Sequence, residues 1–166
     1  MELQWGIKAI SIDYFQLINP KKFANENDID LIENIRNSKI DFGFEIANQS
    51  GIIPSHNLFQ FKTIINFLGT VKGTGNAINL GSIEVTYDFF IEKLSDIEKT
   101  NNGGLPEALL LTFVTTSFST TRGILLAKTA GTFIGQQIIP FLPMEDLRAN
   151  CSEINNKLTA NYSKKN

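Results

Sequence analysis

The sequence has very few of the side chains from which catalytic and metal sites are built. It contains one cysteine, Cys151, and one histidine, His56. A single cysteine cannot form a disulfide within the chain, which favours a reducing compartment. The single histidine lies in a turn beside Pro54, so we expect that the chain assembles neither a His-based catalytic triad nor a metal site with several imidazole ligands. We therefore expect no enzyme activity, no metal and no cofactor, and we assign the protein to the cytoplasm.

An excess of positive charge is also missing. Lysine and arginine number 15 against 17 acidic residues, and the net charge is -2. Nucleic-acid surfaces depend on a basic excess, so we expect no nucleic-acid partner. The first residues, "MELQWGIKAI", lack a basic leader followed by a long apolar run, and no window holds the roughly 18 consecutive apolar residues of a membrane span. We expect neither export nor membrane insertion.

What the chain has in abundance is phenylalanine. There are 13 phenylalanines against three tyrosines and one tryptophan, and 42% of the residues are hydrophobic. Phenylalanine adds apolar area without a polar group, so this composition predicts a ring-rich core. The length is that of one domain. We expect a single domain, ordered over about residues 7–158, with a polar tail at 159–166.

Four segments read as β-strands, because they are rich in β-branched and aromatic residues and are bounded by turn residues. They are 7–19, 38–48, 58–71 and 82–94. The second alternates most clearly, with Phe42 and Phe44 on the apolar face. The polar stretch 21–37 connects the first two strands by crossing over rather than by a hairpin. The pattern predicts an antiparallel sheet with one covered face and one wet face.

Two helices follow the strands. Pro106 suits the first helical position, Glu107 favours the positive end of the helix dipole, and a helical period continues to residue 131. This helix of about 25 residues would be roughly 37 Å long, which is more than one small sheet needs. Residues 144–158 form an amphipathic second helix with Cys151 on its apolar stripe. The expected fold is α+β, a four-stranded antiparallel sheet with both helices packed on one face.

Other motifs favour ordinary structural roles. The segment "GTVKGTGNAINLG" has glycines suited to a phosphate loop, but it lacks the Gly-Lys-Ser/Thr ending and precedes a strand, so we interpret it as a hairpin loop. Carboxylate pairs such as Glu84 and Asp88 lie on outward strand faces, where solvent leaves their pKa values no reason to shift. Cys151 has no histidine near it and reads as a small core residue.

The C-terminal third carries a more specific pattern. Arg122 lies late in the long helix, and the run Gly131, Thr132 and Phe133 is followed by "IIPFLPMEDL". With the order of strands and helices, these residues resemble the SecB family of protein-export chaperones over about residues 7–158. The resemblance implies a homotetramer, a dimer of dimers in which the long helices are sandwiched between the sheets. It also implies an ATP-independent holdase that keeps unfolded precursor proteins competent for export and delivers them to the SecA motor.

The resemblance assigns three surfaces. The client-binding groove would have an apolar wall and a floor on the sheet, comprising Ile138, Ile139, Phe141, Leu142 and Leu147, with Phe42, Phe44 and Phe59. The SecA-binding acidic face would comprise Asp41, Glu45, Glu84, Asp88 and Glu92. The oligomer interface would lie on the long helix, at Phe113, Ser117, Thr121 and Ile124.

Two alternative functions stay open at this point. A SecB-like protein can also act as the chaperone of a toxin–antitoxin system. A module for a small apolar ligand would use the same helix-and-sheet cleft as a closed pocket within one chain. The holdase is distinguished from the latter by a continuous groove exposed on an assembly.

Overall fold

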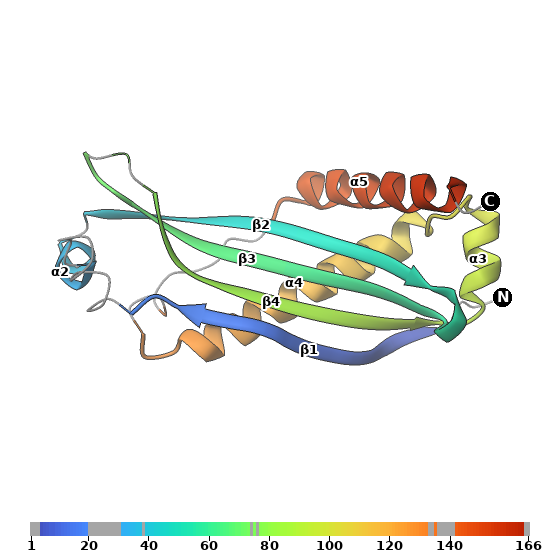
Figure 1. The fold of residues 1–166 in the computed structure, drawn as a ribbon, viewed down its shortest axis with the longest axis horizontal. Helices are drawn as coiled ribbons and strands as arrows, with labels where there is room; N and C mark the ends of the chain where they lie inside the picture. Colours follow the sequence, from blue (N-terminus) through green and yellow to red (C-terminus); the bar gives the residue numbers. More distant parts are fainter. Residues whose placement is uncertain are drawn as a thin grey trace.

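The computed structural model describes residues 4–19, 31–37, 39–73, 75, 77–132, 135 and 142–164. In chain order, its elements are β1 (Trp5–Leu17), α2 (Leu31–Arg36), β2 (Ile40–Ile53), a 3-10 turn η1 (Pro54–His56), β3 (Leu58–Val71), β4 (Ala77–Ile91), α3 (Leu94–Thr100), α4 (Glu107–Thr129) and α5 (Met144–Ser163). Figure 1 shows the four strands as one long sheet.

The strands lie in the order β1-β4-β3-β2, and every neighbouring pair is antiparallel. β1 therefore pairs with β4 rather than with β2, as the predicted crossover requires. The glycine-rich segment joins the paired strands β3 and β4, which confirms that it is a hairpin connection. The sheet has two edges, β1 and β2, and α4 crosses behind it at an angle to the strands (Figure 1). This arrangement confirms the predicted α+β fold.

Strand alternation places the phenylalanine side chains between the sheet and α4. Phe59 and Phe89 are fully buried on the inner face, where both rings stack on Phe113 of α4 with centroids 5.6 and 4.2 Å away. Trp5 of β1 meets the same Phe113 ring edge to face at 5.2 Å. One helical ring thus contacts rings from three strands, which accounts for much of the predicted ring-rich core.

A buried hydrogen bond also joins α4 to the sheet. The Tyr87 hydroxyl on β4 lies 2.6 Å from the Thr121 hydroxyl on α4. Burial raises the pKa of Tyr87 to about 12, because the phenolate would lose its hydration. The buried hydroxyls of Thr63 and Ser117 have no hydrogen-bond partner among the described residues. The helix is therefore held mainly by apolar packing.

The structure departs from the sequence prediction at several points along the chain. The prediction ended the second strand at residue 48, but β2 continues to Ile53, because residues 49–53 pair with β3 instead of forming a turn. β4 begins at Ala77, because Gly81 continues the strand through an irregularity instead of ending a turn. A Cβ at Gly81 would lie 2.4 Å from the backbone oxygen of Gln16, so glycine permits the close pairing with β1. The short helix α3 was not predicted, and α5 continues to Ser163 through residues assigned to the polar tail.

By length and composition, α4 is also the one described helix that would suit a membrane span. Nearly half of its most apolar window is buried inside the molecule. The buried positions include Leu110, Phe113 and Phe118, which face the sheet. Core packing thus accounts for the apolar side of this helix.

Candidate functional site

The second edge of the sheet is accompanied by a helix. α5 runs along β2 (Figure 1), and the Asn48 side-chain amide donates a 3.0 Å hydrogen bond to Oδ1 of Asn150. Further along, two cavities of about 420 and 350 Å³ lie between β2 and α5 and share Asn161 and Lys164. We call the two together the β2–α5 groove. Its lining residues are Asn48, Gln49, Ser50, Gly51, Ile52, Glu98, Gly103, Lys157, Leu158, Ala160, Asn161, Tyr162 and Lys164.

One wall of this groove is the edge of a strand. Asn48, Gln49 and Ser50 are consecutive, and all three line the larger cavity. Consecutive strand residues point to opposite faces of a sheet, so a cavity that touches all three runs along the strand's edge. β2 pairs with β3 on its other side only. Its outward N–H and C=O groups therefore face the groove, as at any unpaired edge.

The opposite wall is one face of α5. Lys157, Ala160, Asn161 and Lys164 line the larger cavity and follow the i, i+3, i+4, i+7 spacing of one helical face. The Lys157 ammonium pairs with Glu153 at 2.6 Å, and both side chains are well exposed. Lys164 forms no ion pair with a described residue. The helical wall of the larger cavity is thus polar and carries two lysines.

The C-terminal half of α5 packs against the loop before α4. Asn155 accepts a hydrogen bond from Leu105 N at 2.9 Å and donates one to Leu105 O at 2.8 Å. Gly103 lies so close to Tyr162 that a Cβ would meet the Tyr162 side chain at 2.1 Å. Gly103 also has a positive φ of 90°, which favours glycine. These contacts fix the position of the helical wall relative to the sheet.

Of the residues predicted to line an apolar groove, those that the structure describes do not line the β2–α5 groove. Phe59 is fully buried and belongs to the core, so it cannot be a groove floor in this conformation. Leu147 is also buried, whereas Leu142 is partly buried against the core. Phe42 and Phe44 lie partly buried on the inner face of β2, where Phe44 meets Phe67 edge to face at 5.7 Å. The remaining predicted wall residues, Ile138, Ile139 and Phe141, lie outside the described residues.

Sequence reasoning missed the strand-edge groove because it searched for apolar side chains. The walls of its larger cavity are the edge of β2 and a polar face of α5, and neither carries an apolar pattern. One signal was available in the sequence. The spacing of Lys157, Ala160, Asn161 and Lys164 continues a helix beyond residue 158 and gives it a polar face with one small residue.

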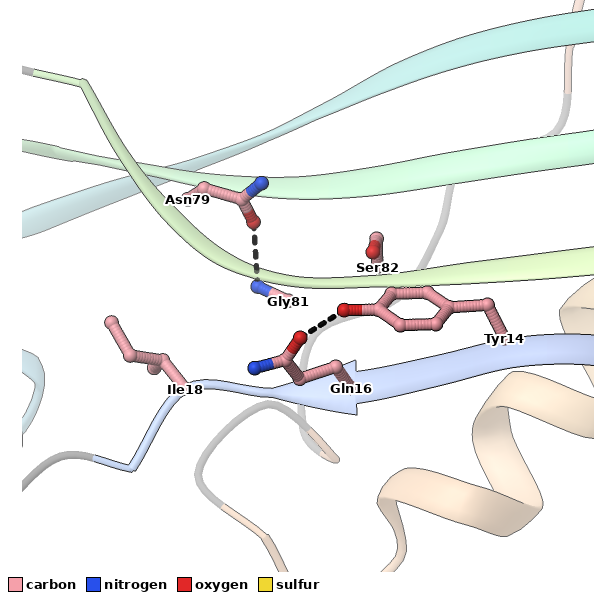
Figure 2. A pocket seen from close by; sticks show the side chains of 6 residues that line it. All are labelled: Tyr14, Gln16, Ile18, Asn79, Gly81 and Ser82. Carbon is pink, nitrogen blue, oxygen red and sulfur yellow. Dashed lines mark hydrogen bonds between the residues drawn. The ribbon is translucent and has the colours of Figure 1, made fainter.

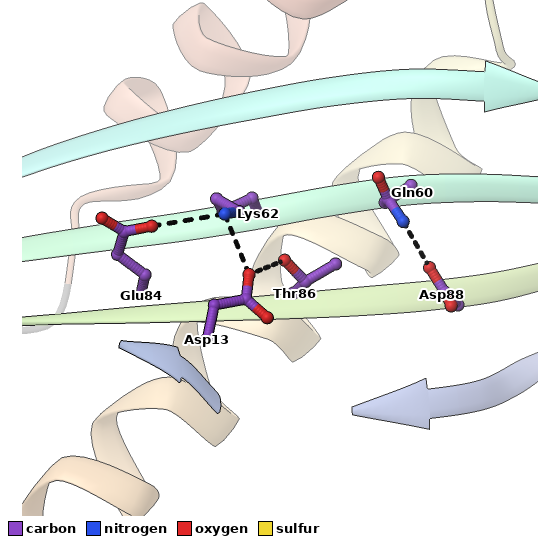
Figure 3. Close-up of polar contacts among 6 residues, drawn as sticks. All are labelled: Asp13, Gln60, Lys62, Glu84, Thr86 and Asp88. Atoms are coloured by element: carbon purple, nitrogen blue, oxygen red, sulfur yellow. Dashed lines mark hydrogen bonds and ion pairs between the residues drawn. The ribbon is translucent and has the colours of Figure 1, made fainter. Parts of the chain in front are cut away.

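The outer face of the sheet carries the predicted acidic residues, but it is partly neutralised. Lys62 of β3 lies between Glu84 of β4, at 3.2 Å, and Asp13 of β1, at 2.9 Å (Figure 3). Thr86 donates a 2.5 Å hydrogen bond to Asp13. This bond and then the Lys62 ammonium lower the pKa of Asp13, and the bond to Asp13 raises the pKa of Lys62. Lys62 thus ties three strands together.

The other predicted acidic residues also lie on this outer side. Gln60 donates a 2.9 Å hydrogen bond to Asp88, and Lys72 pairs with Asp41 at 3.3 Å. Glu45 and Glu92 are exposed. The predicted acidic face therefore exists as a set of positions, but its negative charge is reduced by two lysines.

The predicted oligomer interface needs a correction. Phe113, Ser117 and Thr121 are fully buried beneath the chain's own sheet, so these side chains are already covered within one subunit. Ile124 is partly buried against the same core. The sequence pattern identified the buried stripe of α4 rather than a surface available to a second copy.

The exposed apolar surface lies instead on β1. Four side chains on the helix-facing side of this edge strand are between 41 and 44% exposed, namely Trp5, Ile7, Ile10 and Ile12. The register confirms their side, because Ile10 and Ile12 pair with the buried residues Tyr87 and Val85. Helix α4 covers the inner face of β3 and β4 but leaves this row accessible. An uncovered apolar edge strand is a surface for association.

A smaller cavity lies between β1 and β4. It measures about 210 Å³ and is lined by Tyr14, Gln16, Ile18, Asn79, Gly81 and Ser82 (Figure 2). The Tyr14 hydroxyl donates to Oε1 of Gln16, and Gly81 N donates to Oδ1 of Asn79 at 2.9 Å. These polar groups are already paired with one another, and none of the described residues in the lining is charged.

The described residues form no group of three or more His, Cys, Asp or Glu side chains that suits a metal ion. Cys151 is buried on α5. Burial, and then the nearby charge of Glu107, raises the pKa of the Cys151 thiol. A thiol that stays protonated is a poor nucleophile, so its position agrees with a structural role.

Comparison with known proteins places the fold. No protein-family model matches the chain, and no curated protein matches it by sequence. Among solved structures, it matches the Mycobacterium tuberculosis Rv1957 SecB-like chaperone, which was solved in complex with a ChAD peptide from the Rv1956 HigA1 antitoxin. The match covers 84% of this chain and 91% of that one, with a TM-score of 0.51 and 10% identity. The chain has a SecB-like fold. The structural part of the predicted resemblance is thereby confirmed.

Proposed function

We propose that this SecB-like chain is an ATP-independent holdase that binds extended segments of unfolded polypeptides along the β2–α5 groove. The observation that carries the proposal is a cavity lined by three consecutive residues of the edge strand β2, Asn48, Gln49 and Ser50. A strand edge offers main-chain hydrogen bonds, which any extended polypeptide can accept or donate. Such recognition is therefore tolerant of client sequence, as a holdase requires.

Binding by this mode needs no nucleotide. An extended segment replaces hydrogen bonds to water with hydrogen bonds to β2 and buries part of its surface against α5. Each contact is weak, and ordering the client opposes binding. Several grooves acting on one long client would raise the overall affinity without any single strong site. The proposal therefore depends on an assembly.

The assembly we propose is a homotetramer built on β1. Trp5, Ile7, Ile10 and Ile12 are exposed on a strand whose outer edge pairs with no other described strand. A second copy would bury this row and pair the two edges, and the exposed side of α4 would meet its counterpart. Isologous contacts of this kind give closed dimers, and two dimers give the tetramer that the resemblance implies. We place the assembly in the cytoplasm.

The test is suppression of aggregation by full-length protein in the absence of ATP, with a denatured client diluted from urea. Ala160 is exposed on α5 and lines the groove, so Ala160→Trp should fill it and abolish protection. Ala149 is exposed on the same helix outside the groove lining, and Ala149→Trp is the matched control. Equal protection by both variants would contradict the assignment of the groove. Failure of the unmodified protein to protect any client would contradict the function.

The proposal extends to delivery of clients to the SecA motor through the outer sheet face. Lys62 and Lys72 pair with Glu84 and Asp41, so the carboxylates left without a described ion pair include Glu45 and Glu92. We expect Glu45→Gln/Glu92→Gln to weaken SecA binding. Unchanged binding, or no binding by the unmodified protein, would remove SecA from the proposal while leaving the holdase intact.

One observation favours a second candidate, a chaperone dedicated to an antitoxin. The SecB-like chaperone of similar fold was solved with a peptide from an antitoxin. A dedicated chaperone would bind one such peptide far more tightly than unrelated unfolded chains, whereas a general holdase would bind them with similar affinity. The third candidate, a module for a small apolar ligand, would use the smaller cavity of the groove, where Ile52, Leu158 and Tyr162 are part of the lining.

A further inference from the structure

The larger cavity of the β2–α5 groove is lined by positively charged side chains. Among the described residues that line it, the ionisable side chains are Lys157 and Lys164, and the others are three amides, one serine and one alanine. None of these described residues is a carboxylate. Glu98 lines only the adjoining cavity, beyond the shared residues Asn161 and Lys164. A segment seated against β2 at Asn48–Ser50 would therefore face ammonium groups and neutral hydrogen-bonding groups.

Both ammonium groups are available to a ligand. Lys164 forms no ion pair with a described residue. Lys157 pairs with Glu153 at 2.6 Å, but the two side chains are 61 and 68% exposed. Exposed pairs of this kind contribute little, so an incoming carboxylate can replace Glu153 at small cost. Lys157 and Lys164 are seven residues apart, which places them about two turns, or roughly 10 Å, apart along the helix.

This spacing suits an extended polypeptide. Alternate residues of a strand lie roughly 6.6–6.8 Å apart and project to the same side. A strand paired with the edge of β2 would thus carry side chains toward α5 at every second position, and two acidic residues two or four positions apart would reach both lysines. The amides of Asn48, Gln49 and Asn161 can donate further hydrogen bonds to carboxylates.

We propose that the groove prefers extended client segments that carry acidic side chains. The preference rests on the proposed function, because it assigns a chemical class of client to the same groove. Attraction between exposed groups is screened by salt, so the preference should be strong at low ionic strength and weak at high ionic strength. The backbone contacts to β2 carry no charge and should persist in both conditions.

The experiment uses three fluorescent peptides on one threonine- and valine-rich background, with glutamate, glutamine or lysine at the same alternate positions. Binding to the full-length protein is measured by anisotropy. We expect the glutamate peptide to bind about tenfold more tightly than the lysine peptide at low salt, from two exposed pairs each worth a few-fold. High salt should bring the three affinities close together.

Two charge-reversal variants separate the groove from net charge. Lys157→Glu/Lys164→Glu should reverse the order, so that the lysine peptide binds best. Lys99→Glu/Lys128→Glu changes the net charge by the same amount at exposed lysines outside the groove lining and should leave the order unchanged. Light scattering checks that both variants keep the size of the unmodified assembly.

Each result decides a different claim. Equal binding of all three peptides by the unmodified protein would overturn the acidic preference and leave the holdase proposal standing. The same order of affinities in Lys157→Glu/Lys164→Glu would also overturn it, because the lysines would not be its source. Absence of binding by any peptide would overturn the groove as a client site and the preference with it.

Discussion

The two edge strands of the sheet, β1 and β2, differ in what lies beside them. β2 has α5 alongside it, with Asn48 bonded to Asn150 and a groove between strand and helix. Among the described strands β1 pairs with β4 alone, and Trp5, Ile7, Ile10 and Ile12 on its helix-facing side are more than 40% exposed. Edge strands are usually shielded from unwanted pairing. Here α5 accompanies one edge, whereas the other edge exposes apolar side chains. Our proposal assigns the first edge to clients and the second to another copy of the chain.

The largest effect should come from placing charged side chains on β1. In Ile10→Lys/Ile12→Lys, two ammonium groups would be buried at the proposed interface, and we expect complete dissociation from four times 18.5 kDa to a single subunit in light scattering. Ser11→Lys is the control, because Ser11 pairs with Thr86 on the outer side of the same strand. An unmodified protein that is already monomeric would remove the proposed role of this edge.

The next largest effect should come from the ring that anchors β1 to the core. Phe113 contacts Trp5, Phe59 and Phe89, so Phe113→Ala leaves a cavity under three strands. We expect a loss of about 3–5 kcal/mol in the free energy of unfolding, measured by urea denaturation. Leu111→Ala on the partly buried side of α4 should cost clearly less. Equal losses in the two variants would contradict the stabilising role given to the contacts of the Phe113 ring.

The cover of the β2 edge is tested by a double-mutant cycle. Asn48→Val or Asn150→Leu alone leaves the partner amide unpaired in a partly buried place, and each should cost about 1 kcal/mol in the free energy of unfolding. The double variant should recover part of that loss, because neither amide is then left unsatisfied. Strictly additive losses would show that the two side chains do not interact across strand and helix.

The smallest predicted effect is the pH-dependent contribution of Asp13, on the outer side of β1, to stability. The hydrogen bond from Thr86 and the Lys62 ammonium lower the pKa of Asp13 below 3.8, so Asp13 stabilises the fold above that pH. This contribution is lost as the pH falls through the lowered value. Because Asp13 and Lys62 are partly exposed, the change should be under about 1 kcal/mol. Stability measured at several acidic pH values should depend less on pH in Asp13→Asn, and an unchanged profile would contradict the assignment.

The sheet could be predicted from sequence because its physical signal is local. Alternation in segments such as 38–48 and 58–71 sets which side chains face α4, and the burial of Phe61, Ile65 and Phe67 follows from it. Gly81 misled the prediction of the start of β4, because the same residue serves a turn or a close strand pairing. Only the three-dimensional pairing with β1 decides between them.

The candidate site was harder to predict, since it depends on relations between distant elements. Phe59 and Phe113 carry the same apolar signal whether they form a groove, an interface or a core, and the sequence alone does not show which faces are already covered. The strand edge at Asn48–Ser50 has no apolar side-chain pattern, and the role proposed for it depends on backbone groups, which the sequence does not distinguish. Its place beside Lys157 and Lys164 follows from the packing of α5.

The attachment of α5 also bears on how fast a bound segment can leave. The helix cannot swing away from β2 without breaking both hydrogen bonds between Asn155 and Leu105 and parting Tyr162 from Gly103. Opening the groove sideways is therefore a local unfolding event with its own free energy. A client that fits beneath the helix would leave more readily by slipping lengthwise along the strand edge. Its residence time would then grow with the length of the seated segment and depend little on the movement of the helix.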